Sequence, residues 1–336
     1  MVENAAPEEI VKGLLEGVAP PRPLFLPIVF SHAARIENIP LGSFLTNPTK
    51  ISNALRQVRA RLRSDGVTCY FDPFLESEAL GAKVEWPVND RPPSFVWPEG
   101  PVAGESFKSG STTPPEKGGR VPVAVEVIRR LKTMLRAGGL LMAAVTGPLT
   151  EAASLAQLDT KDAPDHLQLP ESALDLATTA VTGIARAFLE AGASAILIRE
   201  DFLPAMSEDG FADWCSRLRP IVNIVRFYRA LPILVLGRAE GVMANRDQIL
   251  RAEWDCVVCP IVNRKTATLL SELGPSVCGL ALAPDMFSPS PTPDFEGWVS
   301  QIVSEVRPAV ITTAGDLPAS VDIERLNKLW ENLPRR

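Results

Sequence analysis

The chain has no apolar run of the roughly 18 residues that a membrane span requires. Residues 1–18 carry four glutamates and have no apolar centre of the signal-peptide type. The most basic short run, residues 59–63, fits an exposed helix face, and the net charge of −6 argues against a partner rich in phosphate. We therefore expect a cytoplasmic protein that acts on a small molecule and has no nucleic-acid or membrane partner.

Cysteine and histidine are also scarce, with five cysteines and two histidines in 336 residues. An odd number of cysteines spread over a long chain favours reduced thiols over a disulfide framework. Cys256 and Cys259 have the spacing of a metal or redox motif, but residues three apart on a regular strand point to opposite faces. We therefore expect these two thiols to be buried and inert rather than to chelate an ion together.

Apolar runs of strand length alternate with helical patterns along the chain. About eight strands are predicted, and their continuous apolar character is typical of parallel strands buried on both faces. The pattern predicts an α/β fold, a single-domain (β/α)8 TIM barrel over residues 1–336. A doubly wound open sheet would carry a glycine-rich loop after its first strand, where this chain has Phe30-Ser31-His32. The predicted strands are 24–30, 67–71, 139–146, 195–199, 232–236, 255–258, 277–283 and 308–313.

Residues 86–120 are rich in proline, glycine and serine and have little periodicity, which predicts a long loop after the second strand. Four apolar residues in it indicate that it packs over something: Phe95, Val96, Trp97 and Phe107. A lid over a binding site and a plain surface excursion both fit this segment.

Carboxylates follow two of the predicted strands, at the strand ends where barrels of this type place their chemistry. Asp72 follows strand 67–71 and is predicted to act as a general acid or base or to stabilise a cationic intermediate; its alternative is a turn-forming aspartate before Pro73. Glu200 and Asp201 follow strand 195–199. Adjacent strand residues face opposite ways, so at most one of these two points into the barrel mouth, and Arg199 could simply neutralise them.

Several short motifs, none specific alone, share an order and spacing that resembles one enzyme group. They are Ala33-Ala34-Arg35, Tyr70-Phe71-Asp72, Gly119-Arg120-Val121-Pro122 and Gly147-Pro148-Leu149-Thr150. They resemble the uroporphyrinogen decarboxylase superfamily, which contains the decarboxylase of haem synthesis and methyltransferases that move methyl groups to or from corrinoid cofactors. The segment Glu76-Ser77-Glu78-Ala79-Leu80-Gly81 resembles the methyltransferase branch.

The resemblance implies site residues. Asp72 and Glu200 would handle protons or cationic character, and Arg35 and Arg238 would orient the substrate. Arg35 could bind a substrate carboxylate through two parallel hydrogen bonds, or form a salt bridge to Glu37 or Asp72.

Two further residues are predicted to bind substrate. His32 could shuttle protons, lie under a corrinoid, or be structural. Glu78 could share one face of an extended segment with Glu76, or both could stack near a helix start.

The chain also departs from both branches. Ser31, Ser154 and Ala314 stand where the resemblance implies an arginine, a tyrosine and a histidine of the decarboxylase. Only Arg35, His32 and Arg238 could then anchor the four carboxylates of a tetrapyrrole, which argues against the haem-synthesis enzyme. The zinc ligands of the thiol-methylating branch are replaced by Leu236-Gly237-Arg238 and Ala314-Gly315-Asp316, so no zinc or other metal site is predicted.

We therefore expect methyl transfer or demethylation with a corrinoid (cobalamin) supplied by a partner protein. The alternatives are a diverged decarboxylase acting on a carboxylated substrate and a non-catalytic protein that binds a tetrapyrrole or corrinoid.

Overall fold

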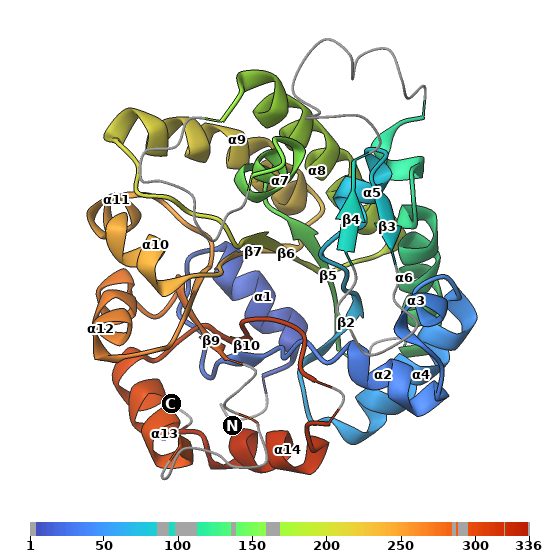
Figure 1. Ribbon diagram of the computed structural model, residues 1–336. Coiled ribbons are helices and arrows are strands. Elements are labelled where there is room, and N and C mark those ends of the chain that lie inside the picture. The colour runs from blue at the N-terminus through green and yellow to red at the C-terminus, as the bar shows by residue number, and fades with distance from the viewer. Residues whose placement is uncertain are drawn as a thin grey trace.

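The computed structural model describes residues 5–85, 94–97, 113–135, 139–158, 169–283, 287, 295–318 and 320–334. Eight parallel strands in the described part form one sheet that curves into a nearly closed barrel (Figure 1). Neighbours follow the order β1-β10-β9-β8-β7-β6-β5-β2, which confirms the predicted (β/α)8 barrel. The strands are β1 (Leu24–Phe25), β2 (Gly66–Tyr70), β5 (Leu140–Thr146), β6 (Ala195–Glu200), β7 (Leu231–Leu236), β8 (Val257–Pro260), β9 (Cys278–Leu282) and β10 (Val310–Thr313).

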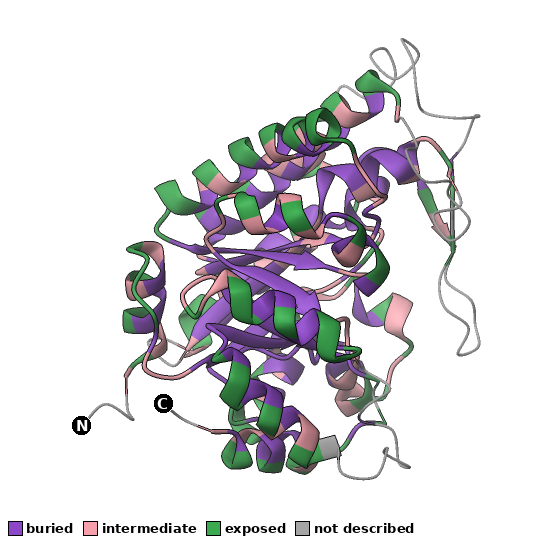
Figure 2. Cartoon of the chain, turned by 90° about the vertical axis from the view of Figure 1, so that its left-hand side faces the viewer, coloured by how far each residue is buried: buried purple, intermediate pink, exposed green. Residues whose placement is uncertain are grey.

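Helices surround the barrel, with their outward faces exposed and the strands buried at the centre (Figure 2). Several begin where a polar side chain accepts a hydrogen bond from the first turn, as Asn47, Ser207, Asn263 and Asp322 do. The helices are α1 (Pro7–Leu15), α2 (Ser31–Glu37), α3 (Leu41–Phe44), α4 (Pro48–Arg61), α5 (Leu75–Ala79), α6 (Val121–Leu135), α7 (Pro148–Leu155), α8 (Glu171–Ala191), α9 (Glu208–Phe227), α10 (Ala239–Ala244), α11 (Arg246–Arg251), α12 (Arg264–Leu273), α13 (Phe295–Val306) and α14 (Ile323–Asn332).

Strand alternation divides the apolar core into an interior part and an outer part. On β6, Leu197 belongs to the interior cluster, whereas Ile198 belongs to the cluster between strands and helices. Helix α1 packs its buried residues on the interior cluster and closes the end of the barrel where the strands begin (Figure 1). Only the end where the strands finish therefore remains for a site.

The barrel closes between β1 and β2 through a carboxylate. The Asp65 N–H donates to the Phe25 carbonyl at 2.9 Å, and the Phe25 N–H donates to the Asp65 side chain at 2.8 Å. Both nitrogens Nη1 and Nη2 of Arg22 lie 2.8 Å from the same carboxylate. These contacts, called the seam below, replace strand pairing at the two ends of the sheet order.

The segment after β2 contains more regular structure than a loop. β3 (Lys83–Glu85) pairs antiparallel with β4 (Ser94–Val96), and a short 3-10 helix spans Pro115–Lys117. Trp97 is buried in a cluster with residues of α7 and α8, and its indole N–H donates to the Ser154 carbonyl at 3.0 Å. Phe107 and most of the predicted loop lie outside the described residues, so neither the lid nor the surface excursion is tested. No described helix is long and apolar enough to cross a membrane.

Candidate functional site at the barrel mouth

Asp72 lies directly after β2 and is tied to Arg120. Its Oδ2 is 2.7 Å from Nη2 of Arg120, and its Oδ1 accepts a hydrogen bond from the Phe74 N–H at 3.0 Å. The second contact is the turn geometry of an aspartate before Pro73. Burial raises the pKa of Asp72, and Arg120 acts against that rise. The side chain has 0% exposure, so an incoming molecule cannot touch it without displacing neighbours, and its catalytic role stays a prediction.

Arg120 also binds Glu78, a predicted substrate ligand. Glu78 Oε2 accepts from Nε of Arg120 at 2.7 Å and from the Arg120 backbone N–H at 3.1 Å. The arginine stands immediately before α6 and thereby joins the end of β2, α5 and the start of α6. The structure thus brings Asp72 and Glu78 together through a cation that the sequence reasoning did not choose as a site residue.

Glu200 faces outward from β6 into a ring of donors. It accepts hydrogen bonds from the backbone N–H groups of Leu149 and Thr150, from the Thr150 hydroxyl and from the Trp214 indole, at 2.7–3.1 Å. Burial raises its pKa to about 7, and these donors oppose the rise. A Cβ on Gly147 would lie 2.3 Å from this carboxyl, so the glycine is required there. Glu200 anchors the start of α7, and its catalytic role stays a prediction.

The other predicted ligands lie elsewhere. His32 and Arg35 lie on α2 and line a cavity of about 520 Å³ together with residues 320–324 at the start of α14. The ion pair that Asp72 makes is with Arg120, not with Arg35. Arg238 is half-buried at the start of α10, just after β7. Their roles as substrate ligands stay predictions.

Three side chains that the sequence reasoning did not select meet inside the mouth. Ala195 and Leu197 face the barrel interior, so Arg199, two residues further along β6, points the same way. The Arg199 guanidinium carbon lies 4.8 Å from the centre of the Phe71 ring, which also packs on the interior cluster. Thr146 is the register partner of Arg199 on β5. Alternate residues of a strand face the same side, so the sequence of residues 195–200 could have identified Arg199 as a side chain that points into the barrel.

Acidic groups balance this arginine. Nη2 of Arg199 lies 2.8 Å from Oδ2 of Asp201. Asp316, after β10, accepts from the backbone N–H groups of Phe30 and Ser31 and from the Ser31 hydroxyl, at 2.5–2.8 Å. Burial raises the pKa of Asp316 to about 6, against the effect of these donors and of Arg199. The positive charge of Arg199 at the mouth is therefore balanced by neighbouring acidic side chains.

Glu76 is the buried hydrogen-bond partner of Thr146. Its Oε2 accepts a hydrogen bond from the Thr146 hydroxyl at 2.9 Å, and only 1% of the residue is exposed. Its Oε1 has no hydrogen-bond partner among the described residues. Burial raises the pKa of Glu76 to about 7, the Thr146 bonds oppose the rise and Asp72 adds to it. Glu76 can therefore be protonated near neutral pH.

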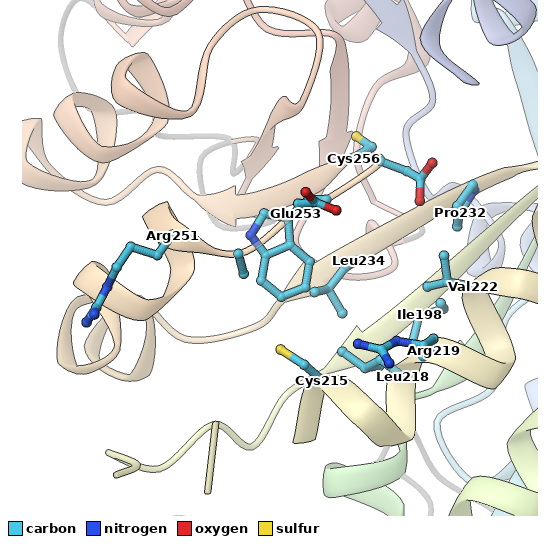
Figure 3. Close-up of a pocket in the computed structure, with 13 residues that line it drawn as sticks. Ile198, Cys215, Leu218, Arg219, Val222, Pro232, Leu234, Arg251, Glu253 and Cys256 are labelled. Carbon is cyan, nitrogen blue, oxygen red and sulfur yellow. The ribbon is translucent and has the colours of Figure 1, made fainter. Parts of the chain in front are cut away.

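A second cavity lies away from this mouth, between α9 and the segment that leads into β8 (Figure 3). It measures about 490 Å³, and it reaches Pro232 and Cys256 near the starts of β7 and β8. Cys256 is in the interior core and Cys259 in the outer core, both buried and free, as their spacing predicts. Burial raises the pKa of the Cys259 thiol to about 12.

A family model described as uroporphyrinogen decarboxylase (URO-D) matches residues 7–258. The chain belongs to the uroporphyrinogen decarboxylase family. The match covers β1 to the start of β8 and includes Asp72, Arg120 and Glu200, whereas Asp316 lies beyond it. No curated protein matches the chain significantly.

One solved structure has the same fold as this chain over nearly its whole length. A methyltransferase from Methanosarcina mazei has the same fold, with a TM-score of 0.76, 18% identity and coverage of 98% of each chain. A homocysteine methyltransferase from Escherichia coli gives a TM-score of 0.47 at 10% identity, covering 95% of this chain and 99% of that one. A phosphoenolpyruvate phosphomutase from Streptomyces platensis subsp. rosaceus gives 0.42 at 12% identity, covering 91% and 79%. At the latter two scores the likeness supports no further conclusion.

Leu236-Gly237-Arg238 and Ala314-Gly315-Asp316, where the resemblance implies the zinc ligands of the thiol-methylating branch, contain no histidine or cysteine. The described residues contain no group of three or more His, Cys, Asp or Glu placed to hold an ion.

Proposed function

We propose that this family member transfers a methyl group between a small substrate and a corrinoid carried by a partner protein. The charge balance of the mouth carries the proposal. Arg199 is matched by Asp201 and lies near Asp316, so the mouth offers little net positive charge. A substrate with several carboxylates would bury charges without partners, which is costly. A methylated molecule of low charge has no such requirement.

The side chains have separable tasks in this proposal. Phe71 offers an aromatic face, and Arg199 can direct a polar group of the substrate. Removal of a methyl group leaves a basic heteroatom, and its protonation lowers the barrier. Glu76 holds a proton that the Thr146 hydroxyl can pass to the mouth. Asp72 and Arg120 hold α5, and thus Glu76, in place.

The corrinoid would approach at the ends of β7 and β10. Gly237, Ala314 and Gly315 there are small and partly exposed, and a Cβ on Gly315 would meet no atom within 4 Å. These residues fit the approach of a flat macrocycle. When bound, the corrinoid supplies a cobalt centre that accepts or donates the methyl group.

The test uses the purified chain with reduced cobalamin and a panel of methyl ethers, methylamines and methyl thioethers. We expect one class to change the corrinoid absorbance at a rate proportional to enzyme concentration. Thr146→Val should lower that rate about a hundredfold because it removes the hydroxyl at nearly constant shape. Glu253→Gln, an exposed change far from the mouth, should have no effect.

Two other results would replace the proposal. Carbon dioxide release from uroporphyrinogen, with no reaction of any methyl donor, would support a diverged decarboxylase. Tight binding of a tetrapyrrole that survives Asp72→Asn, with no turnover in either assay, would support a binding protein.

A further inference from the structure

Polar side chains form a buried column between α5 and α7. At the mouth, the Thr146 hydroxyl bonds to Glu76. Further out, the Ser77 hydroxyl lies 2.9 Å and 3.2 Å from the two oxygens of Glu151 and 3.1 Å from the Ser154 hydroxyl. Thr146 and Ser154, the two ends, are partly exposed, whereas the three residues between them are at most 1% exposed.

The two glutamates of this column have no cation to stabilise an ionised form. Among the described residues, no arginine, lysine or histidine forms an ion pair with either of them, and the groups that act on Glu76 and Glu151 are hydroxyls, backbone groups and other acids. Asp72 is the other acid that acts on Glu76, and its own charge is matched by Arg120. A buried carboxylate in such surroundings is costly, so the neutral acid is favoured. Burial and the neighbouring Glu76 accordingly raise the pKa of Glu151 well above its usual range.

We propose that Glu76 and Glu151 form a buried proton store, and that the column from Ser154 to Thr146 carries protons between the surface and the barrel mouth. The proton delivered to the mouth comes from the Thr146 hydroxyl, which regains one from Glu76. No hydrogen bond joins the two glutamates among the described residues, so Glu151 returns a proton to Glu76 when its carboxyl group turns toward Oε1 of Glu76, the oxygen without a hydrogen-bond partner. Solvent replaces the proton of Glu151 through the hydroxyls of Ser154 and Ser77, so one solvent proton is consumed for each proton delivered. Only the use of that proton rests on the proposed function.

The store is tested without any substrate, by infrared spectroscopy of the full chain in H2O and D2O. Wild-type protein near neutral pH should show the carbonyl bands of buried carboxylic acids. Glu76→Gln and Glu151→Gln should each remove a different band, and Glu253→Gln should remove neither. The Glu76 band should fade as pH rises through about 7, and the Glu151 band should persist.

If a glutamine variant does not fold, Ser77→Ala provides a second measurement, since losing the hydroxyl should shift the Glu151 band without removing it. Ionised glutamates, seen as no band lost in either glutamine variant, would overturn the proposal. So would a Glu151 band unchanged in Ser77→Ala.

The path is tested by turnover with the best donor of the panel. Ser77→Ala should lower kcat several-fold above neutral pH, leave KM unchanged and raise the solvent deuterium isotope effect. A merely structural role for Ser77 would leave the isotope effect as in wild type, and that result would overturn the path. If no methyl donor reacts but the bands behave as expected, the proton store stands and the proposed function falls.

Discussion

Arg120 is the residue on which the predicted site depends. Its guanidinium is 7% exposed, and it pairs with Asp72 and Glu78, whose acidic segments would otherwise repel each other. Because Asp72 is completely buried, its charge is tolerable only while Arg120 remains. The ion pair therefore determines whether α5 keeps Glu76 against Thr146.

A double-mutant cycle tests this dependence. Arg120→Met should lower the free energy of unfolding by about 3–5 kcal/mol, because it leaves the buried carboxylate of Asp72 without its cationic partner. Asp72→Asn in the same chain should restore part of that loss. Urea denaturation measures both changes. The control is Arg246→Met, whose ion pair with Glu272 is more exposed and should be worth less than about 1 kcal/mol. Equal losses in the two arginine variants would contradict the argument.

At the scale of elements, the seam shows how a short strand can close a barrel. β1 spans only Leu24–Phe25, so side chains supply what strand pairing does not. Asp65 accepts the Phe25 N–H and binds Arg22, while its own N–H bonds to the Phe25 carbonyl. The carboxylate thus holds β1 beside the chain entering β2.

We predict that Asp65→Ala lowers the free energy of unfolding by about 2–4 kcal/mol, because it leaves the Phe25 N–H and the Arg22 guanidinium without this acceptor. Asp65→Asn keeps an acceptor for the amide and should cost about half as much. Both values come from urea denaturation, with hydrogen exchange at Phe25 as a local readout. Unchanged exchange at Phe25 in Asp65→Ala would show that the seam does not depend on this side chain.

Helices could be predicted from the sequence wherever their apolar periodicity continued over many residues. Helical periodicity in the sequence predicts helices over 121–135, 171–191 and 295–306, and the structure has helices with these same bounds. The same periodicity predicts one helix over 241–252, but the structure has two helices that meet at Asn245, whose amide donates to Pro204 and Gly241 and accepts from Met206. The bonds with Pro204 and Met206 are tertiary contacts, and helical periodicity carries no information about them.

The site followed less well from the sequence, for the same reason. The position of Asp72 at a strand end was predictable, but its partner Arg120 lies 48 residues further along and follows a segment without periodicity. The inward orientation of Arg199 could have been predicted from the alternation of side chains along its strand alone. Glu151 and Ser77 show no pattern in the sequence, because only the packing of α5 on α7 brings them together.

At the scale of the whole molecule, three buried acids, Glu76, Glu200 and Asp316, lie at the end of the barrel where the strands finish. Helix α1 closes the other end with apolar residues. Glu76, Glu200 and Asp316 all have a pKa raised by burial, to about 7, about 7 and about 6. Ionising these acids therefore costs more free energy in the folded chain than in the unfolded chain. As a result, the free energy of unfolding depends on whether they are protonated.

The sign of the resulting pH dependence follows from proton binding. Between the unfolded pKa of 4.5 and the folded value of about 7, Glu76 binds more protons in the folded chain, so the free energy of unfolding falls as pH rises through this window. The full shift corresponds to roughly 3 kcal/mol for a single group. Urea denaturation between about pH 5 and pH 8 should therefore show highest stability at the acidic end.

Glu76→Gln should remove its part of this slope, because glutamine does not titrate, whereas the exposed control Glu253→Gln should leave the slope unchanged. A Glu76→Gln profile as steep as that of the wild type would mean that Glu76 is already ionised in the folded chain at acidic pH. That outcome would also remove the proton that the proposed chemistry needs at the barrel mouth.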